Sequence, residues 1–139
     1  MKEVILELTK KNKTISSMES CTGGALVNSI TNIPGSSDVI KFSAVTYSNE
    51  FKIKMGVKKQ TIEKYTVYSI EVAKEMSKCI SDFANSSYGI GITGKINCPD
   101  KNNITNEDNL IFVSIYDREK DFYTTLTITA IDESREENK

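Results

Sequence analysis

The sequence of 139 residues contains no histidine, and its three cysteines are widely spaced. Without histidine, Ser-His-Asp and Cys-His mechanisms, imidazole acid/base chemistry and histidine-ligated metal sites are excluded. Cys21, Cys79 and Cys98 are odd in number and never form a CxxC pair. They therefore predict reduced thiols rather than a disulfide framework or a zinc site. We expect a protein that uses no metal ion and no cofactor.

A large excess of one charge and a long hydrophobic run are also missing. Eighteen Lys and Arg oppose nineteen Asp and Glu, so the net charge is −1, which argues against sequence-independent binding of nucleic acid. No apolar run approaches the length of a membrane span, and the N-terminal MKEVILELTKKNK carries charges among its apolar residues, unlike a signal peptide. We expect a cytoplasmic protein with neither nucleic acid nor a membrane as partner.

The length and composition are typical of one globular domain, with 38% hydrophobic and 27% charged residues. We expect the domain to cover residues 1–131, followed by a charged tail over 132–139 that frays.

Hydrophobic periodicity and turn residues predict alternating helices and strands in the first two thirds of the chain. A polar loop over 94–109 and an antiparallel hairpin then complete the domain. The expected helices cover 2–12, 25–33, 49–55, 59–65 and 69–83, and the expected strands cover 14–19, 40–47, 87–93, 110–116 and 122–131. This order predicts an α/β fold, a single-domain three-layer sandwich whose mixed β-sheet is covered by helices.

Two glycine patterns imitate phosphate-binding motifs. Gly89, Gly91 and Gly94 match G-x-G-x-x-G, and residues 89–95 match G-x-x-x-x-G-K. Such motifs bind phosphate only between a strand end and a helix start, whereas these glycines lie inside a predicted strand. We expect them to let another part of the backbone approach the strand closely.

The segment Glu19-Ser-Cys-Thr-Gly-Gly24 has the right context for chemistry, because a predicted strand precedes it and a predicted helix follows it. Backbone N–H groups at a helix start can hold a phosphate or a developing oxyanion. Ser20, Cys21 and Thr22 are three potential nucleophiles. The alternative is structural, with a hydroxyl that caps the helix and glycines that permit tight packing.

A second polar cluster, Thr46-Tyr-Ser-Asn-Glu-Phe-Lys52, follows the second predicted strand. Strand ends line the ligand crevice of open α/β sheets, so this cluster could face the Ser20 turn. Without histidine, a serine needs a lysine amine as base, directly or through a tyrosine. Lys52 and Tyr47 are the available groups. The alternative is that both residues are structural, with Tyr47 a half-buried aromatic side chain of the strand and Lys52 a solvated charged side chain on the following helix.

Together, ESCTGG, IPGSS (33–37), VTYSNEFKIKMGV (45–57) and Thr93-Gly94 resemble the CinA C-terminal domain family, in the same order and over roughly residues 4–117. Members of that family resemble nicotinamide-nucleotide amidohydrolases, which convert nicotinamide mononucleotide to nicotinic acid mononucleotide and ammonia. The resemblance implies a metal-independent enzyme with a small nucleotide substrate.

The same resemblance implies roles for individual residues. Ser20 matches the nucleophile, and Lys52 and Tyr47 match the groups that handle its proton. The substrate-binding residues that it implies are Cys21, Thr22, Gly23, Gly24, Asn49, Thr93, Gly94 and Arg135. Whether the helix start after Ser20 holds the oxyanion or the substrate phosphate stays open.

The chain departs from the family at three places. Lys95-Ile-Asn-Cys-Pro-Asp100 replaces a glycine-rich loop, although Asn97 could supply part of the lost positive-φ freedom. Thr66 stands where the family has glycine, and relatives continue beyond Arg135 into a helix. These departures favour an alternative, a relative that binds a nucleotide or a protein partner without catalysis. A homo-oligomer is one way to cover the sheet surface that the missing helix would expose.

Overall fold

The computed structural model describes residues 1–97, 109–131 and 134–139. Each predicted helix and strand is confirmed, with ends that shift by two residues or fewer, and a short 3-10 helix is added. The elements are α1 (Lys2–Lys10), β1 (Ile15–Glu19), α2 (Ala25–Thr31), η1 (Ser36–Asp38), β2 (Ile40–Val45), α3 (Asn49–Lys54), α4 (Lys59–Tyr65), α5 (Ile70–Ala84), β3 (Tyr88–Gly94), β4 (Leu110–Asp117) and β5 (Phe122–Thr129).

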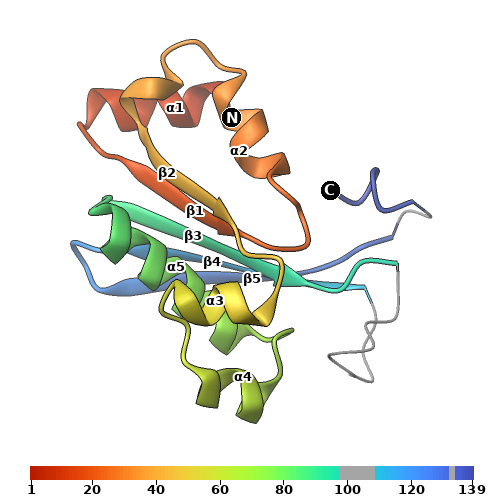
Figure 1. Ribbon diagram of the computed structural model, residues 1–139. Coiled ribbons are helices and arrows are strands. Elements are labelled where there is room, and N and C mark those ends of the chain that lie inside the picture. Colours follow the sequence, from red (N-terminus) through yellow and green to blue (C-terminus); the bar gives the residue numbers. More distant parts are fainter. Residues whose placement is uncertain (98–108, 132–133) are drawn as a thin grey trace.

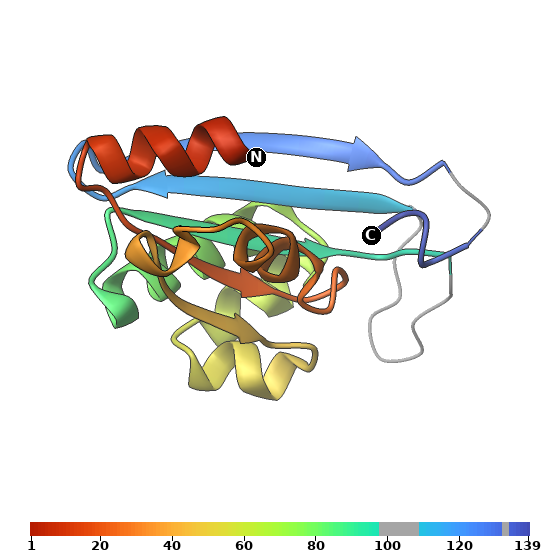
Figure 2. The ribbon, with the colours of Figure 1, turned by 90° about the horizontal axis from the view of Figure 1, so that it is seen from above.

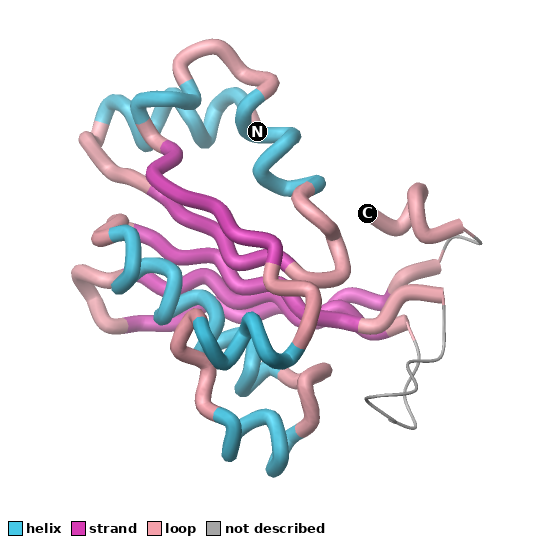
Figure 3. The backbone as a smooth tube through the Cα atoms, viewed as in Figure 1, coloured by secondary structure: helices cyan, strands magenta, loops and turns pink. Residues whose placement is uncertain are grey.

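The strands form one mixed sheet in the order β2-β1-β3-β4-β5, which Figure 2 shows from above. Strands β2, β1 and β3 run parallel, and β4 pairs antiparallel with both β3 and β5. Helices α1 and α2 lie on one side of the sheet, while α3, α4 and α5 lie on the other (Figures 1 and 3). The predicted three-layer sandwich is therefore confirmed.

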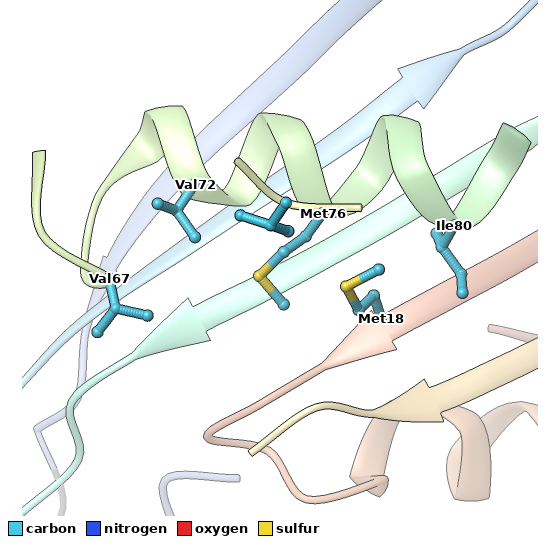
Figure 4. Close-up of a cluster of buried hydrophobic side chains, with 6 residues drawn as sticks. Met18, Val67, Val72, Met76 and Ile80 are labelled. Atoms are coloured by element: carbon cyan, nitrogen blue, oxygen red, sulfur yellow. The ribbon is translucent and has the colours of Figure 1, made fainter. Parts of the chain in front are cut away.

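Helix α5 packs its apolar stripe on the sheet. The Ser69 hydroxyl caps the helix by accepting a hydrogen bond from the Val72 N–H at 3.3 Å. Val72, Met76 and Ile80 repeat every four residues and meet Met18 of β1 in a fully buried cluster (Figure 4). Burying a side chain of this size stabilises the fold by about 1.5–3 kcal/mol.

The glycines of β3 allow this helix to approach, as the sequence predicts. A Cβ atom at Gly89 would lie 1.9 Å from the Ser77 carbonyl oxygen, and one at Gly91 would lie 2.3 Å from the Ala73 carbonyl oxygen. Any side chain at either position would push α5 off the sheet. The first two glycines of the G-x-G-x-x-G pattern therefore serve helix packing.

The carboxyl ends of the three parallel strands meet at one edge of the sheet, as such ends do in open α/β folds. The Ser20 turn follows β1, Thr46 and Tyr47 follow β2, and Lys95 follows β3. The two polar clusters that the sequence singles out are therefore neighbours in space.

The edge strand β5 carries apolar side chains on the sheet face that also bears α1 and α2. Leu126 and Ile128 are 56% and 42% exposed there. Such a strip is suited to self-association, which stays a prediction. In the described ranges, no helix combines the length and apolar character that crossing a membrane requires.

Candidate active site

The structure brings Ser20 and Lys52 together, as the sequence predicts. Ser20 directly follows β1, and Lys52 lies on α3, a helix whose start is capped by the Ser48 hydroxyl. The Lys52 Nζ lies 3.0 Å from the Ser20 Oγ, and the two residues are only 1% and 6% exposed. Two groups that are 32 positions apart in sequence thus form a buried pair.

Backbone carbonyls hold the Lys52 amine in place. It donates to the Thr46 carbonyl oxygen at 2.7 Å and to the Tyr47 carbonyl oxygen at 3.3 Å. Buried amines need such partners, because an unpaired one would carry its full desolvation cost. The structural alternative for Lys52, a solvated helix charge, is therefore wrong.

Tyr47 contacts the amine through its backbone and not through its hydroxyl. Its side chain is 64% exposed, and its hydroxyl accepts a hydrogen bond from the Arg135 Nη2 at 3.1 Å. The expectation that Tyr47 is a half-buried strand aromatic is therefore wrong. Its phenol also does not stand between Ser20 and Lys52, as a proton relay would require. The geometry instead supports a direct proton transfer between the Ser20 hydroxyl and the Lys52 amine.

The contacts also distinguish the three potential nucleophiles of the turn. The Thr22 hydroxyl donates to the Glu19 carboxylate at 2.7 Å. Burial raises the pKa of the Cys21 thiol to about 11, although nearby backbone N–H groups and the charge of Arg135 act in the opposite direction. Cys21 is therefore a neutral thiol at pH 7, and thiols react as thiolates. Of the three candidates, Ser20 is the one with an amine beside its hydroxyl.

The N–H groups at the start of α2 are already used inside the protein. Glu19 is fully buried, and its carboxylate accepts hydrogen bonds from the N–H groups of Gly24 at 3.2 Å, Leu26 at 3.1 Å and Val27 at 2.9 Å. The Ala25 N–H donates to the Thr22 carbonyl oxygen. The expectation that these groups hold an oxyanion or a phosphate is corrected, because Glu19 occupies that place.

Sequence reasoning missed Glu19 as a residue of the candidate site. The signal was an acidic residue that ends a strand five positions before a glycine-led helix start, where a carboxylate is favoured. Gly24 adopts φ +97°, a left-handed conformation that suits glycine at the tight entry to α2.

The remaining predicted residues lie in different surroundings. A Cβ atom at Gly94 would lie 3.3 Å from the Cys21 Sγ, so the end of β3 touches the Ser20 turn. Thr93 is fully buried, and its hydroxyl donates to the Val67 carbonyl oxygen at 2.9 Å, which ties β3 to the segment before α5. Asn49 is a half-buried residue at the start of α3.

The C-terminal segment lies against the site rather than fraying, so that expectation is corrected for residues 134–139 (Figure 1). Arg135 donates to the Ile96 carbonyl oxygen as well as to the Tyr47 hydroxyl. The Lys139 Nζ lies 3.6 Å from where a Cβ of Gly23 would stand. Two cationic side chains of this segment therefore lie beside the Ser20 turn.

The loop after β3 keeps one glycine-like position. Asn97 has φ +53°, as the sequence predicts, and its N–H donates to the Asn109 side-chain oxygen at 2.8 Å. Asn138 of the C-terminal segment donates to the Asn97 side-chain oxygen at 2.8 Å. Residues 98–108 of the predicted polar loop, Cys98 included, lie outside the described residues.

The described part of the chain contains no group of three His, Cys, Asp or Glu residues placed to hold a metal ion. The polar groups around Ser20 are instead an amine, hydroxyls, a guanidinium, backbone amides and the single carboxylate of Glu19. That the protein uses no cofactor stays a prediction.

The fold and the site define a class of α/β proteins, in which a buried serine–lysine pair lies at the carboxyl ends of parallel strands. The model of the CinA C-terminal domain matches residues 1–139. The chain therefore belongs to the CinA C-terminal domain family, as the sequence motifs indicate.

Relatives and solved structures agree with this membership. The chain is 42% identical over 128 residues to a protein of Clostridium botulinum (strain ATCC 19397 / Type A) named competence-damage inducible protein, covering 91% of this chain and 31% of the relative. The chain spans about a third of the length of the curated relatives it matches. The crystal structure of competence/damage inducible protein CihA from Agrobacterium tumefaciens has 27% identity and a TM-score of 0.88, covering 98% of this chain and 82% of that chain.

A competence or damage-inducible protein from Enterobacter asburiae has the same fold at lower identity. Its crystal structure gives a TM-score of 0.88 at 23% identity, covering 99% of this chain and 84% of that chain.

Proposed function

We propose that this chain is a metal-independent amidohydrolase that converts the carboxamide of a nicotinamide nucleotide to a carboxylate and ammonia. The observation that carries the proposal is the 3.0 Å contact between the buried Lys52 Nζ and the Ser20 Oγ. A hydroxyl beside an amine in a protein without histidine has the parts that nucleophilic amide hydrolysis needs. Membership of the CinA C-terminal domain family supports the same reaction.

The proposed reaction begins with Lys52 as a neutral amine, the form that burial favours. Its two N–H groups then serve the carbonyls of Thr46 and Tyr47, and its lone pair faces the Ser20 hydroxyl. Ser20 Oγ attacks the carboxamide carbon while its proton passes to Lys52. The tetrahedral intermediate collapses, Lys52 returns the proton to the departing nitrogen, and ammonia leaves an ester on Ser20. Water, deprotonated by Lys52, then hydrolyses the ester, which releases the acid and restores Ser20.

The oxyanion of the intermediate needs N–H donors near Ser20. The N–H groups of Cys21 and Thr22 are the best candidates, because no acceptor among the described residues takes them in a backbone or carboxylate hydrogen bond. Both N–H groups act to lower the pKa of the Cys21 thiol, which places them close to that sulfur and next to Ser20. Donors that immediately follow a nucleophile are common in oxyanion holes.

The phosphate of the proposed substrate needs cationic partners. Arg135 and Lys139 lie beside the Ser20 turn, and the partners that the structure gives Arg135 are the neutral oxygens of Ile96 and Tyr47. A guanidinium with neutral partners retains its charge for an anionic ligand, and its planar fork suits phosphate.

The test is ammonia release from nicotinamide mononucleotide by the wild-type protein, by Ser20→Ala and by Ser29→Ala. Ser29 is an exposed α2 residue whose hydroxyl donates to the Leu26 carbonyl oxygen of the same helix, so its variant should match the wild type. We expect Ser20→Ala to lose activity by at least about 10³-fold and a chelator to have no effect. Absence of ammonia release by the wild type at high protein concentration contradicts the proposal.

A second candidate is a protein that binds the nucleotide without hydrolysing it. The loop after β3 favours it, because Lys95-Ile-Asn-Cys-Pro-Asp100 replaces the glycine-rich loop of the family, and Lys95 and Ile96 are almost fully buried beside the site. Calorimetric binding of nicotinamide mononucleotide without ammonia release would support this candidate over the enzyme.

A further inference from the structure

Glu19 combines complete burial with an unusually full set of hydrogen bonds. Its exposure is 0%, and its carboxylate accepts four hydrogen bonds of 2.7–3.2 Å. Hydrogen bonds to an ionised carboxylate are roughly twice as strong as neutral ones, and an unpaired buried carboxylate would be very costly. The donors are the Thr22 hydroxyl and the N–H groups of Gly24, Leu26 and Val27. All four belong to the turn after Ser20 or to the first turn of α2.

The backbone of Glu19 also reaches the other half of the site. Its carbonyl oxygen accepts a hydrogen bond from the Thr46 N–H at 2.8 Å. The Thr46 carbonyl oxygen in turn holds the Lys52 Nζ, which contacts the Ser20 Oγ. The side chain of Glu19 is therefore bonded to the turn after Ser20, and its backbone is bonded to the segment that anchors the Lys52 amine.

The carboxylate stands where a bound anion would stand. The first turn of α2 offers N–H groups to an anion, and three of them converge on Glu19. The negative partner of this turn is thus built into the chain one position before the nucleophile. Losing it would release the turn, and a shift of about 1 Å at a reacting atom can lower a rate about 100-fold.

We propose that Glu19 is the positioning residue of the Ser20 nucleophile, with its carboxylate acting as an internal acceptor for four hydrogen bonds that hold the turn against α2. The proposal rests on the proposed function in one respect, the use of Ser20 as nucleophile. The positioning role extends the proposed function, because it assigns a role to a residue that would touch neither substrate nor the reacting atoms. It also implies that the N–H groups at the start of α2 are not the ones that hold the substrate phosphate.

The test measures the rate at which a fluorophosphonate ester labels the Ser20 hydroxyl, followed by mass spectrometry, alongside ammonia release. Glu19→Gln keeps the shape of the side chain but turns an amide NH2, which is a donor, toward N–H groups such as that of Val27. We therefore expect labelling of Ser20 to be about 10-fold to 100-fold slower, with the fold unchanged. Glu19→Ala removes the four heavy atoms that acetate contains. Added acetate should therefore restore labelling of Glu19→Ala in a saturable way, whereas neutral acetamide should not.

Glu7→Gln is the matched control and should label like the wild type, because Glu7 is an exposed residue of α1, which precedes the end of β1 opposite to Ser20. Circular dichroism and thermal melting establish that each variant is folded at the assay temperature. Rescue by acetate separates positioning from bulk stability, because a merely structural loss would lower the melting temperature without an anion-specific return of Ser20 reactivity.

Each outcome decides one of the two proposals. If Glu19→Gln is folded and labels within twofold of the wild type, the positioning role is overturned and the amidohydrolase is untouched. If labelling depends on Glu19 and acetate but no ammonia is released, the positioning role stands and the amidohydrolase fails. If Glu19→Ala is folded and acetate and acetamide act alike, the internal-anion role is overturned.

Discussion

Replacing Lys52 with methionine should remove activity while leaving the protein stable. Methionine keeps a long unbranched side chain at a position that is 1% exposed and removes the amine that lies 3.0 Å from the Ser20 Oγ. General acid–base catalysis contributes roughly 10²- to 10⁴-fold, so we expect ammonia release to fall by that factor.

The stability change follows from the contacts of the amine. Three hydrogen bonds disappear, to Ser20, Thr46 and Tyr47, at about 1 kcal/mol each. Against this loss, an ionisable group leaves a fully buried position, and burying one costs several kcal/mol. These three partners are neutral oxygens, so the substitution leaves no uncompensated charge on them. We expect the free energy of unfolding to change by no more than about 2 kcal/mol.

The assay pairs ammonia release from nicotinamide mononucleotide with denaturant unfolding of the same samples. Lys54→Met is the matched control, because Lys54 lies on the same helix with its amine exposed and bonded to Glu50. That variant should keep wild-type activity. Ammonia release by Lys52→Met within tenfold of the wild type would refute the assignment of Lys52 as the base.

Two further predictions concern stability. Thr66 has φ +68° and ψ 163°, a conformation suited to glycine, so Thr66→Gly should raise the free energy of unfolding by about 1 kcal/mol in denaturant titrations. Thr66→Ala keeps a Cβ and should show no such gain, and equal stabilities of the two variants would contradict the strain. Cys21 has its pKa raised from 9.0 to about 11 by burial. As the pH rises, the Cys21 thiol therefore ionises in the unfolded chain before it does in the folded protein. This difference should lower the free energy of unfolding by about 3 kcal/mol between pH 9 and 11. Cys21→Ala should show a correspondingly flatter pH dependence, and parallel curves for the two proteins would argue against the shift.

Local patterns were sufficient to predict the elements and some of their packing. The four-residue spacing of Val72, Met76 and Ile80 indicated the buried face of α5, and the Ser69 cap follows from its residue type. The spacing of Gly89 and Gly91 predicted a close approach to β3, although not that α5 is the partner. Helix periods, caps and strand alternation depend on neighbours a few positions away, so they can be read directly along the chain.

The environment of the candidate site was harder to predict. Lys52 and Tyr47 are five positions apart, yet one is almost completely buried and the other is 64% exposed. Arg135 was a candidate for substrate binding, but its contact with the Tyr47 hydroxyl joins residues 88 positions apart. Such contacts depend on strand order and helix placement, which local spacing does not encode.

By itself, the sequence determined which chemistry is available. The lack of histidine left lysine as the base for a serine, and the motifs around Ser20 and Lys52 indicated the CinA C-terminal domain family. Only the tertiary structure decided how those groups are used, because burial and hydrogen-bond partners are set by segments that meet at the sheet edge. It paired Ser20 directly with Lys52, and it gave the N–H groups of α2 to the carboxylate of Glu19.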